Sequence, residues 1–243
     1  MSNAPAEVVK EFAPGGRLRA AINFGNLVLA QKDANGEPRG VSVELARELG
    51  RRLNVPVELV HFQAAGRVFD AAKNGAWDVA FLAIEPVRAA EIDFTAPYVI
   101  IEGVYLVPAG SRLKTVADVD RPGVRIGVNK ASAYDLYLTR TLKSAQLVRA
   151  ENGIEEFVRE RLEAAGGIKQ ALAAYAKNHP EVRVMDGRFM EIRQAMGTPK
   201  GKSAAALKYL AAFVEEMKAS GFVADALKRS NQPDATVAPP ASP

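Results

Sequence analysis

The chain has 243 residues, of which 48% are hydrophobic and 25% charged, and its formal net charge is +4. This length suits one large domain or two domains of roughly 100–120 residues each. It has no cysteine, which excludes disulfides, thiolate metal sites and a cysteine nucleophile, and its basic residues form no dense run, which argues against nucleic-acid binding.

Apolar strands alternate with amphipathic helices in the first part of the chain. In order, we predict a strand at 18–24, a helix at 42–53 capped by Ser42, a strand at 55–62, a helix at 65–75 and a strand at 77–84. This alternation is typical of βαβ units around a largely parallel sheet. The strands are apolar runs because helices cover both faces of such a sheet.

A second copy of the pattern follows a long extended segment at 98–107. We predict a strand at 124–128, a helix at 132–142, a strand at 146–150, two helical segments over 153–178 and a strand at 181–185. The glycine pair in EAAGGIK (163–169) is interpreted as a turn. Another extended segment at 188–196 leads to helices at 202–220 and 222–230.

Two α/β units joined by two extended segments predict an α/β protein of two Rossmann-like lobes. We place the first lobe at 15–105 plus 193–230 and the second at 106–192. Such an arrangement predicts a two-segment hinge and a cleft in which a small ligand binds. We expect the outer segments, 1–14 and 231–243, to be flexible tails, because the second is rich in Pro, Ala and Ser.

One arginine follows a strongly apolar run. In GAWDVAFLAIEPVRAAEIDFTAPY (75–98), Arg88 comes just after the strand and the Glu85–Pro86 turn. A solvated surface arginine paired with Glu85 or Glu91 is one interpretation. The other is an anion-binding arginine in a cleft.

Further candidate ligand-binding residues stand where strands end or a helix begins. Ser132 and the aspartate three residues later form a capping box, and a helix start can also hold an anion through its free N–H groups. Ligands of open α/β sheets gather outside the carboxyl ends of the strands, which makes the residues after the first strand candidates, although asparagines there also form turns. The full candidate set is Asn23, Phe24, Asn26, Ala83, Arg88, Ala131, Ser132 and Tyr134.

Catalytic, cofactor and metal signatures are missing from the sequence. It contains no nucleophile elbow, no phosphate-binding loop and no zinc motif, and its histidines are only His61 and His179. We therefore expect a non-enzymatic protein without cofactor or metal. The first 14 residues show no signal peptide and no stretch is long and apolar enough to span a membrane.

Four segments carry a further signal: GEPRGVSVELARELGRRLNVPVELV, VFDAAKNGAWDVAFLA, EPVRAAEIDFTAPYV and GVRIGVNKASAYDLYL. Together they resemble the family 3 extracellular solute-binding proteins, which are type II periplasmic binding proteins that serve ABC importers. The likeness extends from about Gly16 to Ser230. It implies two α/β lobes with two crossovers, a periplasmic location, a permease partner and a monomeric protein.

The resemblance also assigns roles to individual residues. In the family, an arginine after the third strand holds the carboxylate of the ligand, and Arg88 matches it, with DFTAPY (93–98) behind it. The turn at the helix start of the second lobe donates hydrogen bonds to the same carboxylate, and its match is Ala131–Ser132.

The chain departs from the family where an amino group would bind. The hydroxyl or glycine residues that usually precede the arginine are replaced by AFLAIE, and the aspartate that usually pairs with the ammonium has no counterpart near EAAGGIK. An α-amino ligand would lack its usual counter-charge, unless Glu102 or Glu191 replaces it.

The resulting prediction is a solute-binding protein that closes its cleft over a small carboxylate-bearing ligand, an amino acid or a related organic acid. One alternative is an enzyme similar to cyclohexadienyl dehydratase, with Glu102, Glu163 or Glu191 as proton donor. Another is a ligand-sensing module without a role in transport.

Overall fold

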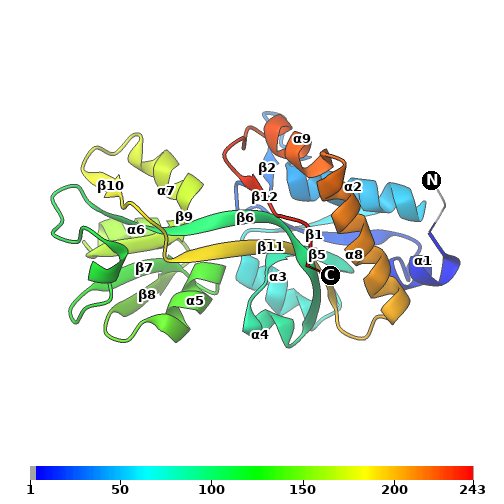
Figure 1. Ribbon diagram of the computed structural model, residues 1–243, viewed down its shortest axis with the longest axis horizontal. Helices are drawn as coiled ribbons and strands as arrows, with labels where there is room; N and C mark the ends of the chain where they lie inside the picture. The colour runs from blue at the N-terminus through cyan, green and yellow to red at the C-terminus, as the bar shows by residue number, and fades with distance from the viewer. Residues whose placement is uncertain (1–3, 243) are drawn as a thin grey trace. The chain divides into compact units, whose positions relative to one another are not determined.

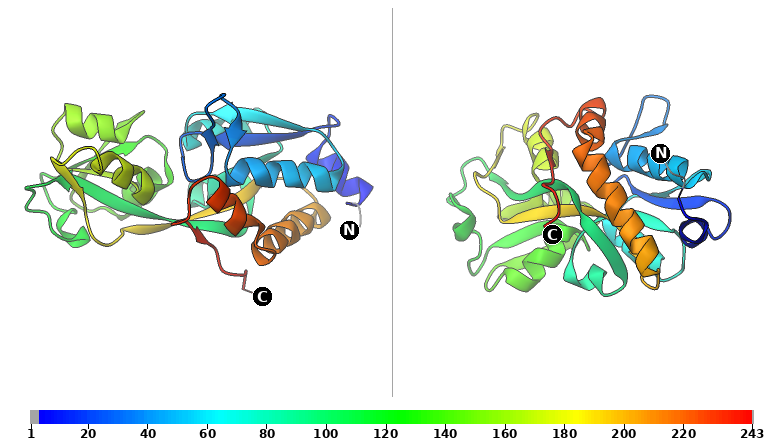
Figure 2. Two further views of the ribbon diagram at one scale, coloured as in Figure 1. Left: turned by 90° about the horizontal axis from the view of Figure 1, so that it is seen from above. Right: turned by 45° about the vertical axis from the view of Figure 1, so that its right-hand side comes forward.

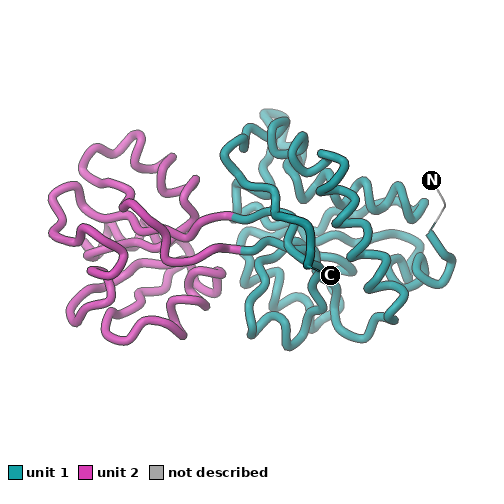
Figure 3. Tube along the Cα trace, viewed as in Figure 1, with its two compact units in different colours: residues 1–100, 193–243 teal, residues 101–192 magenta. Residues whose placement is uncertain are grey.

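The computed structural model describes residues 4–242 and divides into two compact units. Unit 1 consists of residues 1–100 and 193–243, and unit 2 of residues 101–192, as Figure 3 shows. The chain crosses between the units twice, within strand β6 (Ile92–Pro108) and within strand β11 (Met190–Pro199). Strand β6 contains the segment predicted to be extended at 98–107, and β11 contains all but the first two residues of the segment predicted at 188–196.

The sheet of unit 1 is built from parallel strands with one antiparallel addition. Its order is β4-β1-β5-β11, in which β1 is parallel to β4 and β5 while β11 is antiparallel to β5. The bounds are β1 Leu18–Asn23, β4 Val57–Phe62 and β5 Val79–Ala83. Every residue of β5 is buried, as expected for a strand with both faces covered.

Helices cover both faces of this sheet. Figure 1 shows α2 (Val41–Leu53) and α3 (Ala65–Ala72) on opposite sides of the unit 1 strands. Trp77 is buried in the core beneath α3. The C-terminal helices α8 (Ala204–Ala219) and α9 (Phe222–Arg229) pack together, with α9 also against α2 (Figure 2).

The predicted cap of α2 is wrong. Gly40 occupies the N-cap position with a φ of 116°, so the helix begins at Val41 and Ser42 lies inside its first turn. The hydroxyl of Ser42 donates instead to the carbonyl of Leu29, at 2.8 Å. Glycine adopts a φ in this region without steric cost. Gly40 can therefore serve as the N-cap residue, and the helix starts earlier than the position of the serine suggests. A two-stranded ribbon precedes the helix, formed by β2 (Gln31–Lys32) and β3 (Pro38–Arg39).

Unit 2 repeats the same plan on a smaller scale. Its strand order is β6-β9-β7-β8, with β7 parallel to β8 and β9 while β6 runs antiparallel to β9 and β10. The remaining bounds are η1 Val116–Asp118, β7 Arg125–Asn129, α5 Ala133–Thr141, β8 Gln146–Ala150, α6 Gly153–Arg159, β9 Ala164–Ile168, α7 Lys169–Ala176 and β10 Val182–Val184.

The turn predicted at EAAGGIK is also wrong, because this segment is strand β9. The strand lies between β6 and β7, and four of its five residues are buried. A Cβ on Gly166 would lie 3.3 Å from Leu138, and one on Gly167 would lie 3.2 Å from Leu172. Small residues therefore allow helices to approach the strand, although alanine and glycine have low intrinsic strand propensity.

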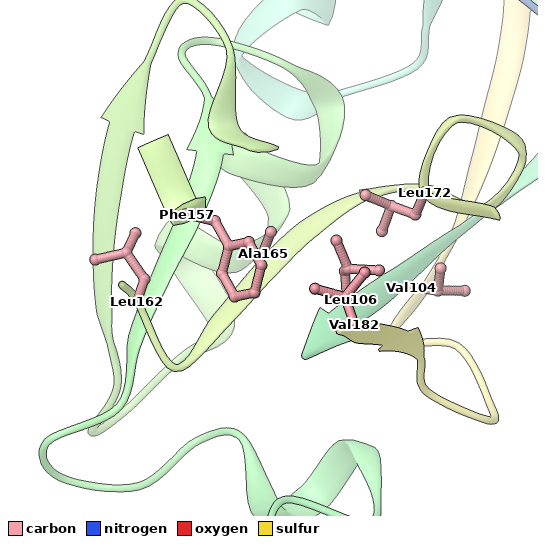
Figure 4. Packing of buried hydrophobic residues seen from close by; sticks show 7 residues of the cluster. All are labelled: Val104, Leu106, Phe157, Leu162, Ala165, Leu172 and Val182. Carbon is pink, nitrogen blue, oxygen red and sulfur yellow. The ribbon is translucent and has the colours of Figure 1, made fainter. Parts of the chain in front are cut away.

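The core of unit 2 forms where β6, β9 and β10 meet α6 and α7. Figure 4 shows the buried cluster, which consists of Val104, Leu106, Phe157, Leu162, Ala165, Leu172 and Val182. Its members come from elements spread over the unit, so burial of their side chains ties the strands to the helices.

Both segments expected to be flexible tails contain ordered structure. Helix α1 (Ala6–Phe12) buries Val8 and Phe12, which gives this N-terminal segment an apolar anchor. At the other end, β12 (Thr236–Val237) pairs with β6, and Ala238 is buried beside it. Residues 1–3 and 243, the outermost parts of these segments, lie outside the described residues. Within residues 4–242, no helix is both long and apolar enough to cross a membrane.

Candidate functional site

Arg88 is placed by a single helical turn at the end of β5. Pro86 opens this turn, α4 (Pro86–Ala89), because its fixed φ suits the first helical position. The carbonyl of Glu85 accepts the backbone N–H groups of Arg88 and Ala89, at 3.0 and 2.9 Å. The turn brings the guanidinium back over the strand end, where its Nη1 donates to the carbonyl of Ala83 at 3.1 Å.

The pairing of β5 fixes the side on which this contact lies. Ile84 donates its backbone N–H to Arg193 of β11, and Gln194 lies opposite Ala83. Because successive residues of a strand direct their polar groups to opposite sides, the Ala83 carbonyl points away from β11 and toward β1. The guanidinium of Arg88 therefore lies at the carboxyl edge of the β1–β5 pair.

The charge of Arg88 is buried. Its exposed fraction is 1%, and burial lowers its pKa below the usual value to about 10, while the charge of Glu85 acts in the opposite direction. Glu85 is itself only 2% exposed. The interpretation of Arg88 as a solvated surface arginine is therefore wrong, because both side chains have been removed from water.

The last residue of β1 and the loop after it contribute three of the predicted residues to the same edge. Asn23 and Asn26 are buried, and their Oδ1 atoms accept the backbone N–H groups of Gly25 and Val28, at 2.9 and 3.1 Å. These are the local contacts of turn-forming asparagines. The ring of Phe24 is flanked by His61, with ring centroids 5.0 Å apart, and by the ammonium of Lys32, 5.2 Å from its centroid.

In unit 2, the start of α5 gathers Ala131, Ser132 and Tyr134. The Ser132 hydroxyl oxygen accepts the N–H of Asp135 at 3.1 Å, which confirms the predicted cap. The carboxylate of Asp135 accepts the N–H of Ala131 at 2.8 Å, one residue before the position that a standard capping box uses. Burial raises the pKa of Tyr134 to about 12, partly offset by hydrogen bonds with the Ser132 side chain and the Asn129 backbone.

Glu102, Glu163 and Glu191, the candidate proton donors of a dehydratase, are held in ion pairs within unit 2. Two of them, Glu102 and Glu191, were also the candidate counter-charges for a ligand ammonium group. Glu102 pairs with Lys169 at 2.9 Å and Arg188 at 3.1 Å, and Glu191 pairs with Arg188 at 2.8 Å. Glu163 accepts from the backbone and side chain of Arg125, and this hydrogen-bonded pairing lowers the pKa of Glu163. The pKa of Glu102 is also lowered, chiefly by its hydrogen bond from Lys169.

Two polar residues of unit 1 were not among the predicted site residues. One is Glu85, whose burial was not visible because glutamates before a turn are usually exposed. The other is Gln194 of β11, which is 4% exposed and whose Oε1 accepts no hydrogen bond from the described residues. Its position opposite Ala83 follows from strand pairing, which local sequence does not reveal.

Nothing in the described part of the chain suggests a metal centre. Within residues 4–242, no group of three or more His, Asp or Glu side chains is arranged to hold a metal ion. The site residues are an arginine, a serine, amides and aromatic rings, a set suited to binding an organic anion.

Residues 25–230 match the family of bacterial extracellular solute-binding proteins, family 3. The chain belongs to this family. It is also 27% identical over 174 residues to a protein of Neisseria gonorrhoeae named "Probable histidine-binding protein". This stretch covers 69% of the chain and 64% of that relative, so the chain spans somewhat less than two thirds of the relative's length.

Solved structures of similar fold support the same fold class. A solute receptor for L-cysteine of Neisseria gonorrhoeae has a TM-score of 0.78 and 24% identity, over 93% of this family 3 chain and 94% of the receptor. An ancestral amino acid-binding protein, described as a precursor of cyclohexadienyl dehydratase, has a TM-score of 0.75 and 24% identity, over 92% and 99% of the two chains. The predicted type II periplasmic binding protein fold is confirmed.

Proposed function

We propose that this family 3 protein binds a small carboxylate-bearing ligand, an amino acid or a related organic acid, and delivers it to the permease of an ABC importer. In this proposal Arg88 of unit 1 and the α5 start of unit 2 both contact the ligand carboxylate, and binding favours closure of the two units over it. A periplasmic location and a monomeric state form part of the proposal.

The buried guanidinium of Arg88 is the observation that carries this proposal. It lies at the carboxyl edge of β1 and β5, the usual ligand side of an open α/β sheet. Burial lowers its pKa to about 10, so its charge is poorly solvated. A carboxylate matches the planar fork of the guanidinium with two parallel hydrogen bonds and restores the missing solvation.

The start of α5 supplies a second anion-binding group. The first turn of a helix leaves backbone N–H groups without intrahelical partners, and the helix dipole favours negative charge there. Ala133 and Tyr134 begin this turn, whereas the N–H of the N-cap residue Ser132 donates to the carbonyl of Asn129 at 3.2 Å. Contacts from both units would make ligand affinity higher in a closed state than in an open one, which is what drives a hinge transition.

The names of similar proteins favour an amino acid as ligand. The relatives reported above are named for binding histidine, L-cysteine and amino acids in general. Delivery to a permease is an inference from family membership.

The carboxylates of unit 2 argue against a dehydratase reaction. A general acid must carry its proton at the working pH. Ion pairing instead lowers the pKa of Glu102 and of Glu163, which keeps both ionised near neutral pH. Glu191 is likewise paired with Arg188.

A ligand screen tests the proposed function. Thermal denaturation of the full chain is measured with L-amino acids, keto acids, aromatic acids and dicarboxylates, and hits are confirmed by calorimetry. A ligand that binds only the folded chain, present at a concentration of about 100 times its Kd, stabilises the folded chain by about 2.7 kcal/mol. This raises Tm by several degrees. If no carboxylate-bearing compound raises Tm while uncharged analogues do, the proposal is wrong.

A further inference from the structure

Strand β6 is anchored on both sides of the point where it leaves unit 1. Ile100 pairs with Thr236 of β12, which belongs to unit 1, whereas Gly103 pairs with Ile168 of β9 in unit 2. Residues 101–102 lie between these two anchors. A change in the hinge angle therefore bends β6 chiefly at 101–102.

Strand β11 crosses back between the units as the hydrogen-bonded neighbour of β6 (Figure 3). On the unit 2 side, the N–H of Phe189, which directly precedes the strand, donates to the carbonyl of Gly103 at 2.9 Å. On the unit 1 side, the carbonyl of Arg193 accepts the N–H of Ile84 at 2.9 Å. The bending residues of this strand are therefore 190–192.

One arginine joins the two bending segments. Glu102 lies in the segment of β6 and Glu191 in that of β11, and Arg188 pairs with both, at 3.1 and 2.8 Å. Lys169, the first residue of α7, also pairs with Glu102, at 2.9 Å. These four side chains, which we call the hinge cluster, connect the two crossing strands through charge in addition to their backbone hydrogen bonds.

The hinge cluster is exposed enough for dissolved salt to reach it. Its four side chains are between 33% and 57% exposed, and three of them line a cavity of about 450 Å³ in unit 2. Ion pairs of this kind are weak, and mobile ions screen them. A weak interaction is nevertheless sufficient to change the populations of two hinge states, because such states lie close in free energy.

We propose that the hinge cluster is a salt-sensitive clamp that biases the equilibrium between the hinge states of this chain. Each glutamate moves with the backbone of its own strand, so a bend at the crossing changes its distance from Arg188. The hinge state that keeps both ion pairs is favoured, and screening by salt or loss of Arg188 removes the preference. This inference goes beyond the proposed function, because it concerns the motion of the units and not the ligand.

The absence of cysteine allows this motion to be measured without a ligand. Lys73→Cys in unit 1 and Lys177→Cys in unit 2, both at exposed positions, carry a donor and an acceptor dye for single-molecule energy transfer. The Debye length falls from about 10 Å in about 0.1 M NaCl to about 3 Å in about 1 M NaCl. Over this range we expect the ratio of the hinge populations to change by about threefold or more, because two exposed ion pairs are screened.

Substitution of Arg188 should remove this salt response. In Arg188→Met, the population ratio at low salt should differ from that of the doubly labelled parent by about threefold or more, and NaCl should change it little. Arg159→Met is the matched control. Arg159 also pairs with two glutamates, Glu156 and Glu160, but both belong to α6 or its C-cap, away from the crossing strands. Its population ratio and salt response should equal those of the parent.

Two results would overturn the proposal. One is a population ratio of the labelled parent that is the same at both salt concentrations, a single distance independent of salt included, and this result is decisive even if Arg188→Met does not fold. The other is an Arg188→Met variant that retains the full salt response or behaves as Arg159→Met does. Neither result touches the proposed function, whose failure would appear in the ligand screen instead.

Discussion

Replacing Arg88 by methionine tests whether this arginine anchors the ligand. The substitution keeps an unbranched side chain of similar length and removes the charge. Burial lowers the pKa of Arg88 to about 10, because the charged guanidinium has lost much of its solvation by water. A ligand carboxylate offsets this cost on binding. We therefore expect Arg88→Met to weaken binding by about 100-fold or more.

The stability of the ligand-free protein should respond differently. Because the folded-state pKa of Arg88 lies below its unfolded value, the charged side chain disfavours folding at every pH below about 10. The substitution removes this cost but also removes the hydrogen bond to Ala83 and leaves Glu85 without its buried counter-charge. These effects oppose one another, so the free energy of unfolding should change by less than about 2 kcal/mol.

The assay combines calorimetry for Kd with urea unfolding for stability, and Arg47→Met, at an exposed position of α2, is the matched control. The control should leave both quantities at the wild-type values. If Arg88→Met binds the ligand as tightly as the wild type, Arg88 is not the anchor. If it loses more than about 4 kcal/mol of stability, Arg88 is primarily a structural residue of unit 1.

Four further substitutions test the local structure. Ser132→Ala removes the acceptor for the Asp135 N–H and should cost about 1 kcal/mol, measured by urea unfolding; no loss would contradict the cap. Gly40→Ala should cost more than about 2 kcal/mol, because φ is 116° and the new Cβ would lie 2.5 Å from the Leu29 carbonyl, whereas Gly36→Ala, at a φ of 82° in open space, should cost only about 1 kcal/mol from backbone strain. Equal losses in the two glycine variants would refute the steric argument. For Glu102, whose pKa is lowered by Lys169, the ion pair contributes stability above the ordinary pKa of 4.5 that is lost as pH falls through the lower folded-state pKa. Glu102→Gln should therefore be less stable than the wild type near neutral pH and converge with it in acid, and a constant difference would contradict this assignment.

The parts of the fold that sequence predicted well are those with strong periodicity. Strands β1, β4, β5 and β8 and helices α2, α5, α8 and α9 all lie where alternating apolar runs placed them, within a few residues. Strand β9 escaped prediction because AAGGI has neither branched side chains nor alternation, and it becomes a strand only through pairing with β6 and β7.

The termini were mispredicted for a related reason. Their composition lacks large apolar runs, but a few contacts suffice to order them: Val8 and Phe12 for α1, and the backbone pairing of β12 with β6. Composition reports the average tendency of a segment, whereas one well-placed apolar side chain or strand edge decides whether that segment is ordered.

The sequence by itself determined the two-unit α/β plan, the family and the identity of Arg88 as the leading anion-binding candidate, because strand–helix alternation and local motifs are encoded in consecutive residues. Only the tertiary structure decided that Arg88 and Glu85 are buried together, that Gln194 lies opposite Ala83, and that Glu102 and Glu191 are occupied by cations. Burial, strand pairing and ion pairing bring together residues distant in the chain, and the solvation and charge of a site depend on those neighbours rather than on the adjacent sequence.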